Sequence, residues 1–292
     1  MKRLLLPLLL FPFLIHAQGW ENVQITANKV ASNVYYLKGQ GGNIGVLIGS
    51  DGVLLIDNQF APLTDKIIAA VKEISPAQIT YLVNTHYHGD HAGGNENFKN
   101  KEVEIIAHSN VIKRLKTSFS DPIMDRTVEA KSEGYWPTVN LPFNETGLKL
   151  YEEELSIVHV PSSHTDGDVI VHFKKANVIH AGDAFVRYGF PFIDVSAGGS
   201  IDGFIAAQEK ILSLSNANTK IIPGHGGVSS IDDVNELLTM LKETRKIIES
   251  EKSSGVALED LIPKNPLKEY HDRWNGSFIT TDLFVQLVYE SL

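Results

Sequence analysis

The sequence predicts a mixed α/β fold in which strands and helices pack in layers. In the first half, short apolar runs rich in Val, Ile and Leu alternate with stretches of helical periodicity. The second half shows the same order of elements without repeating the sequence. In both halves, polar turns that carry His or Asp follow apolar runs. Layered α/β folds build their sites at that edge, so we expect a functional site there.

Residues 1–17 have the pattern of a secretory signal peptide. Two basic residues precede an apolar run at 4–15, and Ala17 is a small residue at the expected cleavage point. The run is too short to span a bilayer comfortably, although an uncleaved anchor stays open. We therefore expect a periplasmic or secreted protein without stable membrane insertion after cleavage, and a single domain over residues 18–292.

Charge and cysteine content exclude several classes of function. The 292-residue chain has a formal net charge of -9, and cleavage of the signal would bring it to about -11. Such a surface repels nucleic-acid phosphates, so we expect a small-molecule substrate and no nucleic-acid partner. The chain has no Cys. A lipoprotein anchor and disulfides are therefore excluded, and any metal site must use His, Asp or Glu. The sequence does not indicate an oligomeric state.

Elements of the first half follow from apolar runs and from apolar residues that recur every three to four positions. Pro62 precedes one expected helix, and Ser109 can cap another. The expected strands are 23–27, 34–37, 44–48, 52–56, 79–83 and 103–107, and the expected helices are 63–74 and 109–116.

The second half begins after an irregular stretch. Residues 117–145 hold several prolines and aromatic residues without clear periodicity, and loops this long are usually lids, binding loops or disordered segments. Regular patterns then resume. The expected strands are 148–151, 155–160, 169–173, 178–181 and 219–222, and the expected helices are 200–214, 231–249 and 280–292.

The densest chemical signal lies in residues 84–95, directly after the expected strand 79–83. Four potential metal ligands fall there within six residues, namely His86, His88, Asp90 and His91. Imidazole nitrogens and carboxylate oxygens suit zinc or a similar divalent ion. The alternative is a polar surface turn with a chance cluster of histidines. We disfavour it because burying these groups is costly without a shared purpose.

Three later turns add residues of the same ligand types. His164 follows the strand that ends at residue 160, Asp183 follows the strand ending at 181, and His225 follows the strand ending at 222. Each lies in a turn rich in Gly, Ser or Pro. Because strand ends meet along one edge of a layered α/β fold, we expect these turns to join the 84–95 motif.

In this order and with these flanking residues, the seven ligand positions resemble the metallo-β-lactamase superfamily. The resemblance covers the chain from about residue 23 to the C-terminal helix. It implies a four-layer αββα sandwich with its site along one edge, and two Zn²⁺ ions or other divalent metals. The implied ligands are His86, His88 and His164 for one ion, and Asp90, His91 and His225 for the other, with Asp183 bridging them. The resemblance also implies that Asp57 orients a ligand imidazole.

The resemblance further implies a hydrolase. Two divalent ions about 3.5–4 Å apart share a hydroxide nucleophile at neutral pH, and one of them polarises the substrate carbonyl or phosphoryl oxygen. Asp90 and Asp183 are then the expected catalytic carboxylates, with Asp90 also shuttling a proton. His88 favours hydrolysis, because flavodiiron oxidoreductases of the same fold are expected to have Glu there.

Substrate class stays open at this stage. β-Lactams and lactones or esters lead, thioesters and phosphodiesters are alternatives, and a non-catalytic zinc carrier is the alternative of another class. Asp183 stands where β-lactamases with a thiolate have Cys, which resembles thioesterase, lactonase and phosphodiesterase branches. Residues 223–226 and the signal resemble the β-lactamase branch, in which some enzymes keep a Lys near the position of Arg187. The loops expected to decide the substrate are 39–43, 117–145 and 187–199.

The other histidines are expected to have packing, capping or surface roles. They are His108, His159, His172, His180 and His271. Tyr87 lies between ligands and is expected to line the cleft. Aromatic residues of the irregular stretches either fill the core or form an apolar substrate wall, and the two readings are evenly balanced. These residues are Tyr135, Trp136, Phe143, Tyr188, Phe190 and Phe192.

Overall fold

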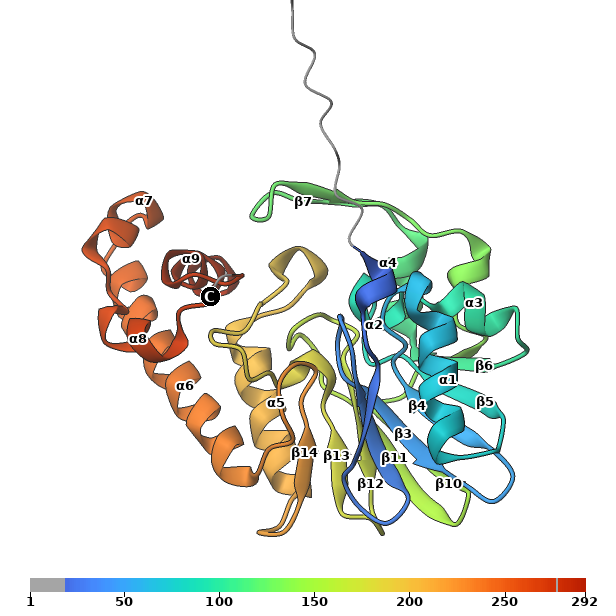
Figure 1. Ribbon diagram of the computed structural model, residues 1–292. Coiled ribbons are helices and arrows are strands. Elements are labelled where there is room, and N and C mark those ends of the chain that lie inside the picture. Colours follow the sequence, from blue (N-terminus) through green and yellow to red (C-terminus); the bar gives the residue numbers. More distant parts are fainter. Residues whose placement is uncertain (1–18, 277) are drawn as a thin grey trace, which may run out of the picture.

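The computed structural model describes residues 19–276 and 278–292, so the expected signal peptide lies outside the described residues. Two large sheets stack face to face, and helices cover the outer face of each sheet (Figure 1). The predicted mixed α/β fold with its αββα order of layers is thereby confirmed.

The first sheet has seven strands in the order β1-β2-β3-β4-β5-β6-β9. They are β1 (Thr26–Lys29), β2 (Val34–Lys38), β3 (Ile44–Ile48), β4 (Val53–Ile56), β5 (Ile79–Val83), β6 (Glu104–His108) and β9 (Val139–Leu141). Strands β4, β5, β6 and β9 run parallel, so their carboxyl ends share one edge.

The second sheet has five strands in the order β10-β11-β12-β13-β14. They are β10 (Glu145–Leu150), β11 (Glu153–His159), β12 (Val169–Phe173), β13 (Val178–His180) and β14 (Lys220–Ile222). Strands β13 and β14 are parallel, and the other pairs are antiparallel. Strands β3, β5 and β12 have the predicted bounds.

Helices close the sandwich on both sides. The α-helices are α1 (Thr64–Ile74), α2 (Gly89–Ala92), α3 (Asn95–Lys99), α4 (Ser109–Lys116), α5 (Ile201–Leu214), α6 (Ile231–Ser253), α7 (Leu258–Leu261), α8 (His271–Trp274) and α9 (Thr281–Ser291). The 3₁₀ helices are η1 (Trp20–Asn22), η2 (Ala61–Leu63), η3 (Glu133–Tyr135), η4 (Gly182–Ala184), η5 (Val195–Ala197), η6 (Ile262–Lys264) and η7 (Lys268–Tyr270). Helix α6 is longer than predicted, and α7 and α8 are too short to show a period in the sequence.

Three apolar clusters separate the layers. Ile67 and Val71 of α1 pack on the outer face of the first sheet. Ile56 and Val171 belong to a second cluster, which lies between the sheets. Phe204 of α5 belongs to the third, between the second sheet and the helices α5, α6 and α9. Burial of this apolar surface is the main favourable contribution to folding, and it fixes the strand ends that carry the site.

The expectation of an irregular segment over 117–145 was partly wrong. It contains a hairpin of β7 (Phe119–Asp121) and β8 (Arg126–Val128), and β9 joins the first sheet beside β6. These strands have three residues each, too few for alternation to show in the sequence. The hairpin reaches across one end of the sandwich toward the side of α9 (Figure 1).

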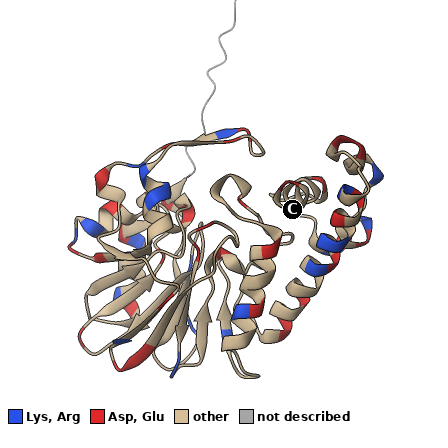
Figure 2. Ribbon diagram, turned by 180° about the vertical axis from the view of Figure 1, so that it is seen from behind, with Lys and Arg blue, Asp and Glu red and all other residues tan. Residues whose placement is uncertain are grey.

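Charged residues lie mainly on helices and loops, while most strand positions are uncharged. Positions of both signs are interspersed, for example along α6 (Figure 2). Among the described residues, no helix combines the length and apolar character that a membrane crossing requires.

Candidate metal centre

All seven predicted ligands lie together at one edge of the two sheets. Their ligand atoms form three overlapping groups, each within 4.8 Å. The groups are His86, His88 and His164; Asp90, His91 and His225; and His86, His91 and Asp183. The first two are the triads that the resemblance implies. The third shares His86 with the first and His91 with the second, and it adds Asp183.

Strand ends of both sheets deliver these residues. The motif 84–95 follows β5 directly, and α2 carries Asp90 and His91. Asp183 follows β13 and His225 follows β14, the two parallel neighbours of the second sheet. Two glycines give the ligands room: a Cβ at Gly42 would collide with the His91 ring, and one at Gly224 with Asp183 Oδ1. The backbone at Gly42 therefore packs closely against His91, and the backbone at Gly224 packs closely against Asp183.

Asp57 lies against the inner part of the site. It follows β4, is fully buried, and its Oδ2 lies 2.7 Å from His91 Nδ1. The Thr85 amide and hydroxyl also donate to Asp57, each at 2.7 Å. Because the Thr85 hydroxyl proton is used in this way, its oxygen accepts from Nδ1 of His86 at 2.9 Å. Both imidazoles therefore keep the lone pair of Nε2 turned inward.

Asp194 plays the corresponding part for His88, although no local pattern in the sequence predicts it. Its Oδ2 accepts from His88 Nε2 at 2.9 Å and from the Tyr87 hydroxyl at 2.5 Å. Burial raises the pKa of Asp194, but the hydrogen bond and positive charge of His88 outweigh it and hold the pKa well below its usual value. Tyr87 thus supports a ligand from behind and is not among the residues that line the cleft, contrary to expectation.

His164 completes the pattern, because its Nδ1 donates to the carbonyl oxygen of Phe192 at 2.7 Å. The turn that carries it is closed by Asp168, which accepts from the Thr165 amide at 2.8 Å and hydroxyl at 2.5 Å. Four ligand imidazoles, His86, His88, His91 and His164, are thereby fixed with one nitrogen facing the centre.

The inward atoms fit a pair of divalent ions. Asp183 Oδ1 lies 3.1 Å from His91 Nε2 and 3.6 Å from His225 Nε2, while Oδ2 lies 3.7 Å from His164 Nε2. Within the described residues, His86 Nε2 and Asp183 Oδ1 are buried without a hydrogen-bond partner. Nε2 atoms of His91 and His225 are 3.3 Å apart. Ligands on a tetrahedral zinc ion at about 2.0–2.1 Å have about this spacing.

Electrostatics favour the metal-binding forms of His86, His164 and Asp183. Burial, followed by neighbouring histidines, lowers the pKa of His86 well below its usual value and that of His164 to about 4. Burial opposes ionisation of Asp183, yet the charges of His225 and His91 keep its pKa well below the usual value. Neutral imidazoles and an ionised carboxylate are the forms that bind a metal ion. Burial opposes protonation of His91 and His225, but the charge of Asp183 outweighs it and raises the pKa of both above the usual value.

The remaining expectations divide clearly. Among the other histidines, the side chain of His108 caps α4 and that of buried His180 lies 3.1 Å from the Asn43 carbonyl oxygen. The guanidinium of Arg187 pairs with Asp233 and Glu236, at 3.0 and 2.8 Å. Arg187 is not among the residues that line the cavity described below.

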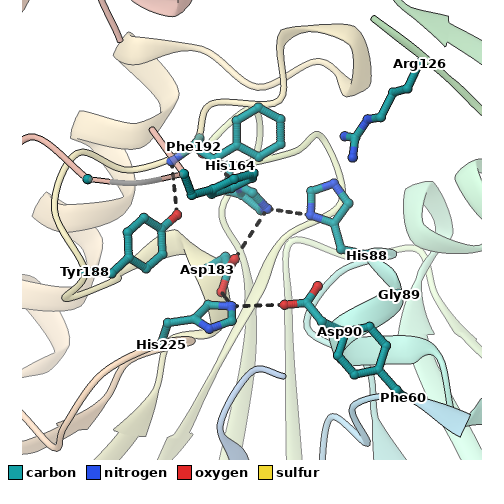
Figure 3. Close-up of a pocket in the computed structure, with 12 residues that line it drawn as sticks. Phe60, His88, Gly89, Asp90, Arg126, His164, Asp183, Tyr188, Phe192 and His225 are labelled. Carbon is teal, nitrogen blue, oxygen red and sulfur yellow. Dashed lines mark hydrogen bonds and ion pairs between the residues drawn. The ribbon is translucent and has the colours of Figure 1, made fainter. Parts of the chain in front are cut away.

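A cavity of about 490 Å³ opens over the ligands (Figure 3). Of the six aromatic candidates, Tyr188 and Phe192 line it, whereas Phe190 is a core residue. Phe192 fits both readings, because it also belongs to the same core cluster as Phe190, whereas Phe143 is 66% exposed and is not a core residue. Phe60, Phe278 and Arg126 also line the cavity, and the sequence analysis had not placed them there.

The family model described as the metallo-beta-lactamase superfamily matches residues 37–225. That range holds all seven ligands and more than half of the chain. The chain belongs to the metallo-beta-lactamase superfamily. Its relatives include β-lactamases, an acyl-CoA thioesterase and a hydroxyacylglutathione hydrolase, and this protein is a hydrolase.

Individual relatives are distant. The chain is 22% identical over 232 residues to "Metallo-beta-lactamase type 2" of Bacillus cereus, covering 76% of this chain and 84% of that protein. It is 23% identical over 209 residues to "Acyl-coenzyme A thioesterase MBLAC2" of Gallus gallus, covering 65% and 74%. The structure of a metallo-beta-lactamase from Pontibacter korlensis superposes with a TM-score of 0.62 at 16% identity, covering 75% of this chain and 99% of that one. The last match concerns the fold alone.

Proposed function

We propose that this hydrolase works with two divalent ions, zinc first among them, and cleaves a carbonyl substrate. The leading substrates are β-lactams and lactones or esters. One observation carries the proposal. Two triads of imidazole and carboxylate groups stand side by side, and the two oxygens of Asp183 face one triad each.

Two bound ions would supply a hydroxide nucleophile at neutral pH and polarise the carbonyl oxygen of the substrate. The chain's own residues do the rest. Asp183 holds the two triads in register. Asp90 Oδ2 lies 3.1 Å from His225 Nε2, and its side chain is 29% exposed at the cavity. The Asp90 carboxylate is therefore placed to accept a proton at Oδ and pass it to the leaving group.

The cavity supports a carbonyl substrate more than a phosphodiester. Among the described residues that line it, Arg126 is the one Lys or Arg, and the rings of Phe60, Tyr188, Phe192 and Phe278 form much of its wall. A phosphodiester favours several cationic partners. A thioester is the second candidate, because the thioesterase relative shares the family and Asp183 replaces the Cys of thiolate-type β-lactamases.

A substrate panel on the zinc-loaded full chain tests this proposal. It comprises nitrocefin, a carbapenem, an acyl-lactone, a thioester and bis-p-nitrophenyl phosphate. We expect turnover of at least one carbonyl compound that exceeds turnover of the phosphodiester, and its loss in His88→Ala. His172→Gln, outside the metal groups, is the matched control and should keep the activity. Stoichiometric zinc without any hydrolysis would instead indicate a carrier.

A further inference from the structure

Arg126 is set apart from the other cationic residues by its position over the metal centre. It begins β8 in the hairpin that crosses one end of the sandwich. Its side chain is 40% exposed and extends toward His88 at the wall of the cavity (Figure 3). Nothing in the proposed hydrolysis uses this side chain.

Contacts fix the base of the Arg126 side chain and leave its end available. Nε donates to Asp121 Oδ2 at 2.9 Å, and buried Asp121 is itself bound by the Ser196 hydroxyl at 3.1 Å. Nη2 forms an ion pair with Asp194 Oδ2 at 3.9 Å, which is too long for a hydrogen bond. Within the described part of the chain, neither terminal nitrogen makes a hydrogen bond. The guanidinium therefore presents a free fork of N–H groups, the arrangement that binds carboxylates.

The two neighbouring carboxylates, Asp194 and Asp121, do not occupy the terminal N–H groups of Arg126 with hydrogen bonds. Asp194 is already the acceptor for His88 and Tyr87. Asp121 contacts only the Nε edge of Arg126. The cation also lies on the side of His88 and Phe192: its Cζ is 5.8 Å from the Phe192 ring centroid, and Phe192 stacks on His88 at 5.9 Å. Arg187, by contrast, points to α6.

Aromatic rings line the cavity wall on one side of the guanidinium. Phe278 is 54% exposed, and its ring meets that of Phe192 edge to face at a centroid distance of 5.7 Å. An exposed ring at a cavity mouth gains free energy when an apolar ligand covers it. The wall beside Arg126 thus suits a group that is apolar over most of its surface and anionic at one point.

We propose that Arg126 is a specificity-determining residue that binds a carboxylate on the substrate, on the His88 side of the metal centre. The substrate class is then an anionic carbonyl compound with an apolar body. This inference rests on the proposed hydrolysis of a carbonyl substrate and adds which members of that class the site prefers.

Matched substrate pairs test the inference. One pair is a chromogenic cephalosporin with its free carboxylate and the methyl ester of that carboxylate. The other is mono-p-nitrophenyl glutarate and its methyl ester. For the pair that wild type hydrolyses, Arg126→Gln should lower kcat/KM for the anionic member about 10–100-fold, mainly through KM. The neutral member should change less than about 3-fold.

Two control variants complete the comparison. Arg126→Lys keeps the charge and should restore part of the preference. Arg187→Gln removes a charge from the α6 side and should change neither member. Equal losses for both members in Arg126→Gln would overturn the inference, as would unchanged kinetics. If wild type hydrolyses no member of either pair, the proposed function fails for these substrates, and binding decides the role of Arg126.

Binding is measured by calorimetry on the metal-loaded full chain, with N-benzoylglycine and its methyl ester as probes. Wild type should bind the carboxylate at least about 10-fold more tightly than Arg126→Gln does, while the two proteins bind the ester alike. Equal affinity of both proteins for the carboxylate would mean that the anion binds elsewhere, and would overturn the inference independently of turnover.

Discussion

Asp57 and Asp194 both orient a ligand imidazole, but the chain holds them in different ways. Asp57 follows β4 directly, and its amide donates to the Val83 carbonyl oxygen of the neighbouring parallel strand at 2.8 Å. Asp194 lies in the loop between η4 and α5, where its Oδ1 accepts from the Ala197 amide at 3.0 Å. One support belongs to the sheet and the other to a loop at the cavity.

This difference predicts different consequences. Asp57 is fully buried behind the ligands and accepts from three donors of Thr85 and His91, so it is needed to hold this part of the site in place. Asp194 serves His88 and Tyr87 and lies near Arg126. The loop that carries Asp194 and the β7–β8 hairpin that carries Arg126 thereby link His88 to the cavity wall proposed to bind substrate. We infer that the contacts of Asp57 mainly determine how tightly the site retains metal. The contacts of Asp194 mainly determine how the substrate is positioned against the metal.

Asp183→Asn should have the largest effect, because it removes a charge that both triads share. Hydrolysis should fall more than about 100-fold, and the zinc content should drop below that of wild type. Steady-state rates and elemental analysis measure both. Unchanged rate and zinc content would show that Asp183 is not a ligand.

Asp57→Asn should come next. The Asn side chain keeps one acceptor oxygen but loses the negative charge. Its NH₂ group would face one of the donors that Asp57 now accepts from, Thr85 or His91. We expect a loss of roughly 2–4 kcal/mol in the free energy of unfolding and a drop of about 10–100-fold in zinc affinity. Urea unfolding and competition with a chelator provide the readouts. A variant with wild-type stability and wild-type zinc affinity would show that Asp57 does not orient the ligands.

Asp194→Asn should affect zinc less than Asp57→Asn does, with a drop of about 10-fold. The free energy of unfolding should fall by less than about 2 kcal/mol, because the loop relaxes more readily than the sheet. Measuring both variants in parallel tests the comparison directly. A greater loss of stability in Asp194→Asn would reverse the assignment of the two sides.

Tyr87→Phe should have the smallest effect. It removes the hydroxyl that donates to Asp194 and lies 3.1 Å from His88 Nε2, but it leaves the hydrogen bond between His88 and Asp194 in place, so stability should fall by about 1 kcal/mol. Zinc affinity should stay within about 3-fold of wild type. Thermal unfolding and chelator competition suffice for the measurement, and loss of metal would give Tyr87 a larger part than its position indicates.

The same contrast explains what the sequence could predict. The seven ligands and Asp57 lie in turns directly after apolar strands, and both the strands and the ligand types are visible locally. Asp194 and Arg126 come from a loop and a hairpin of three-residue strands, where no periodicity marks which side chains turn inward. Their roles depend on tertiary contacts with Tyr87 and Asp121, which no local pattern encodes. Secretion of the chain stays a prediction.

Anomalous diffraction at the zinc edge, on crystals of the zinc-loaded protein, tests the central claim most directly. We predict two peaks, one beside His86, His88 and His164 and one beside Asp90, His91 and His225, with Asp183 contacting both. A single peak, or two peaks with Asp183 contacting neither, would contradict it.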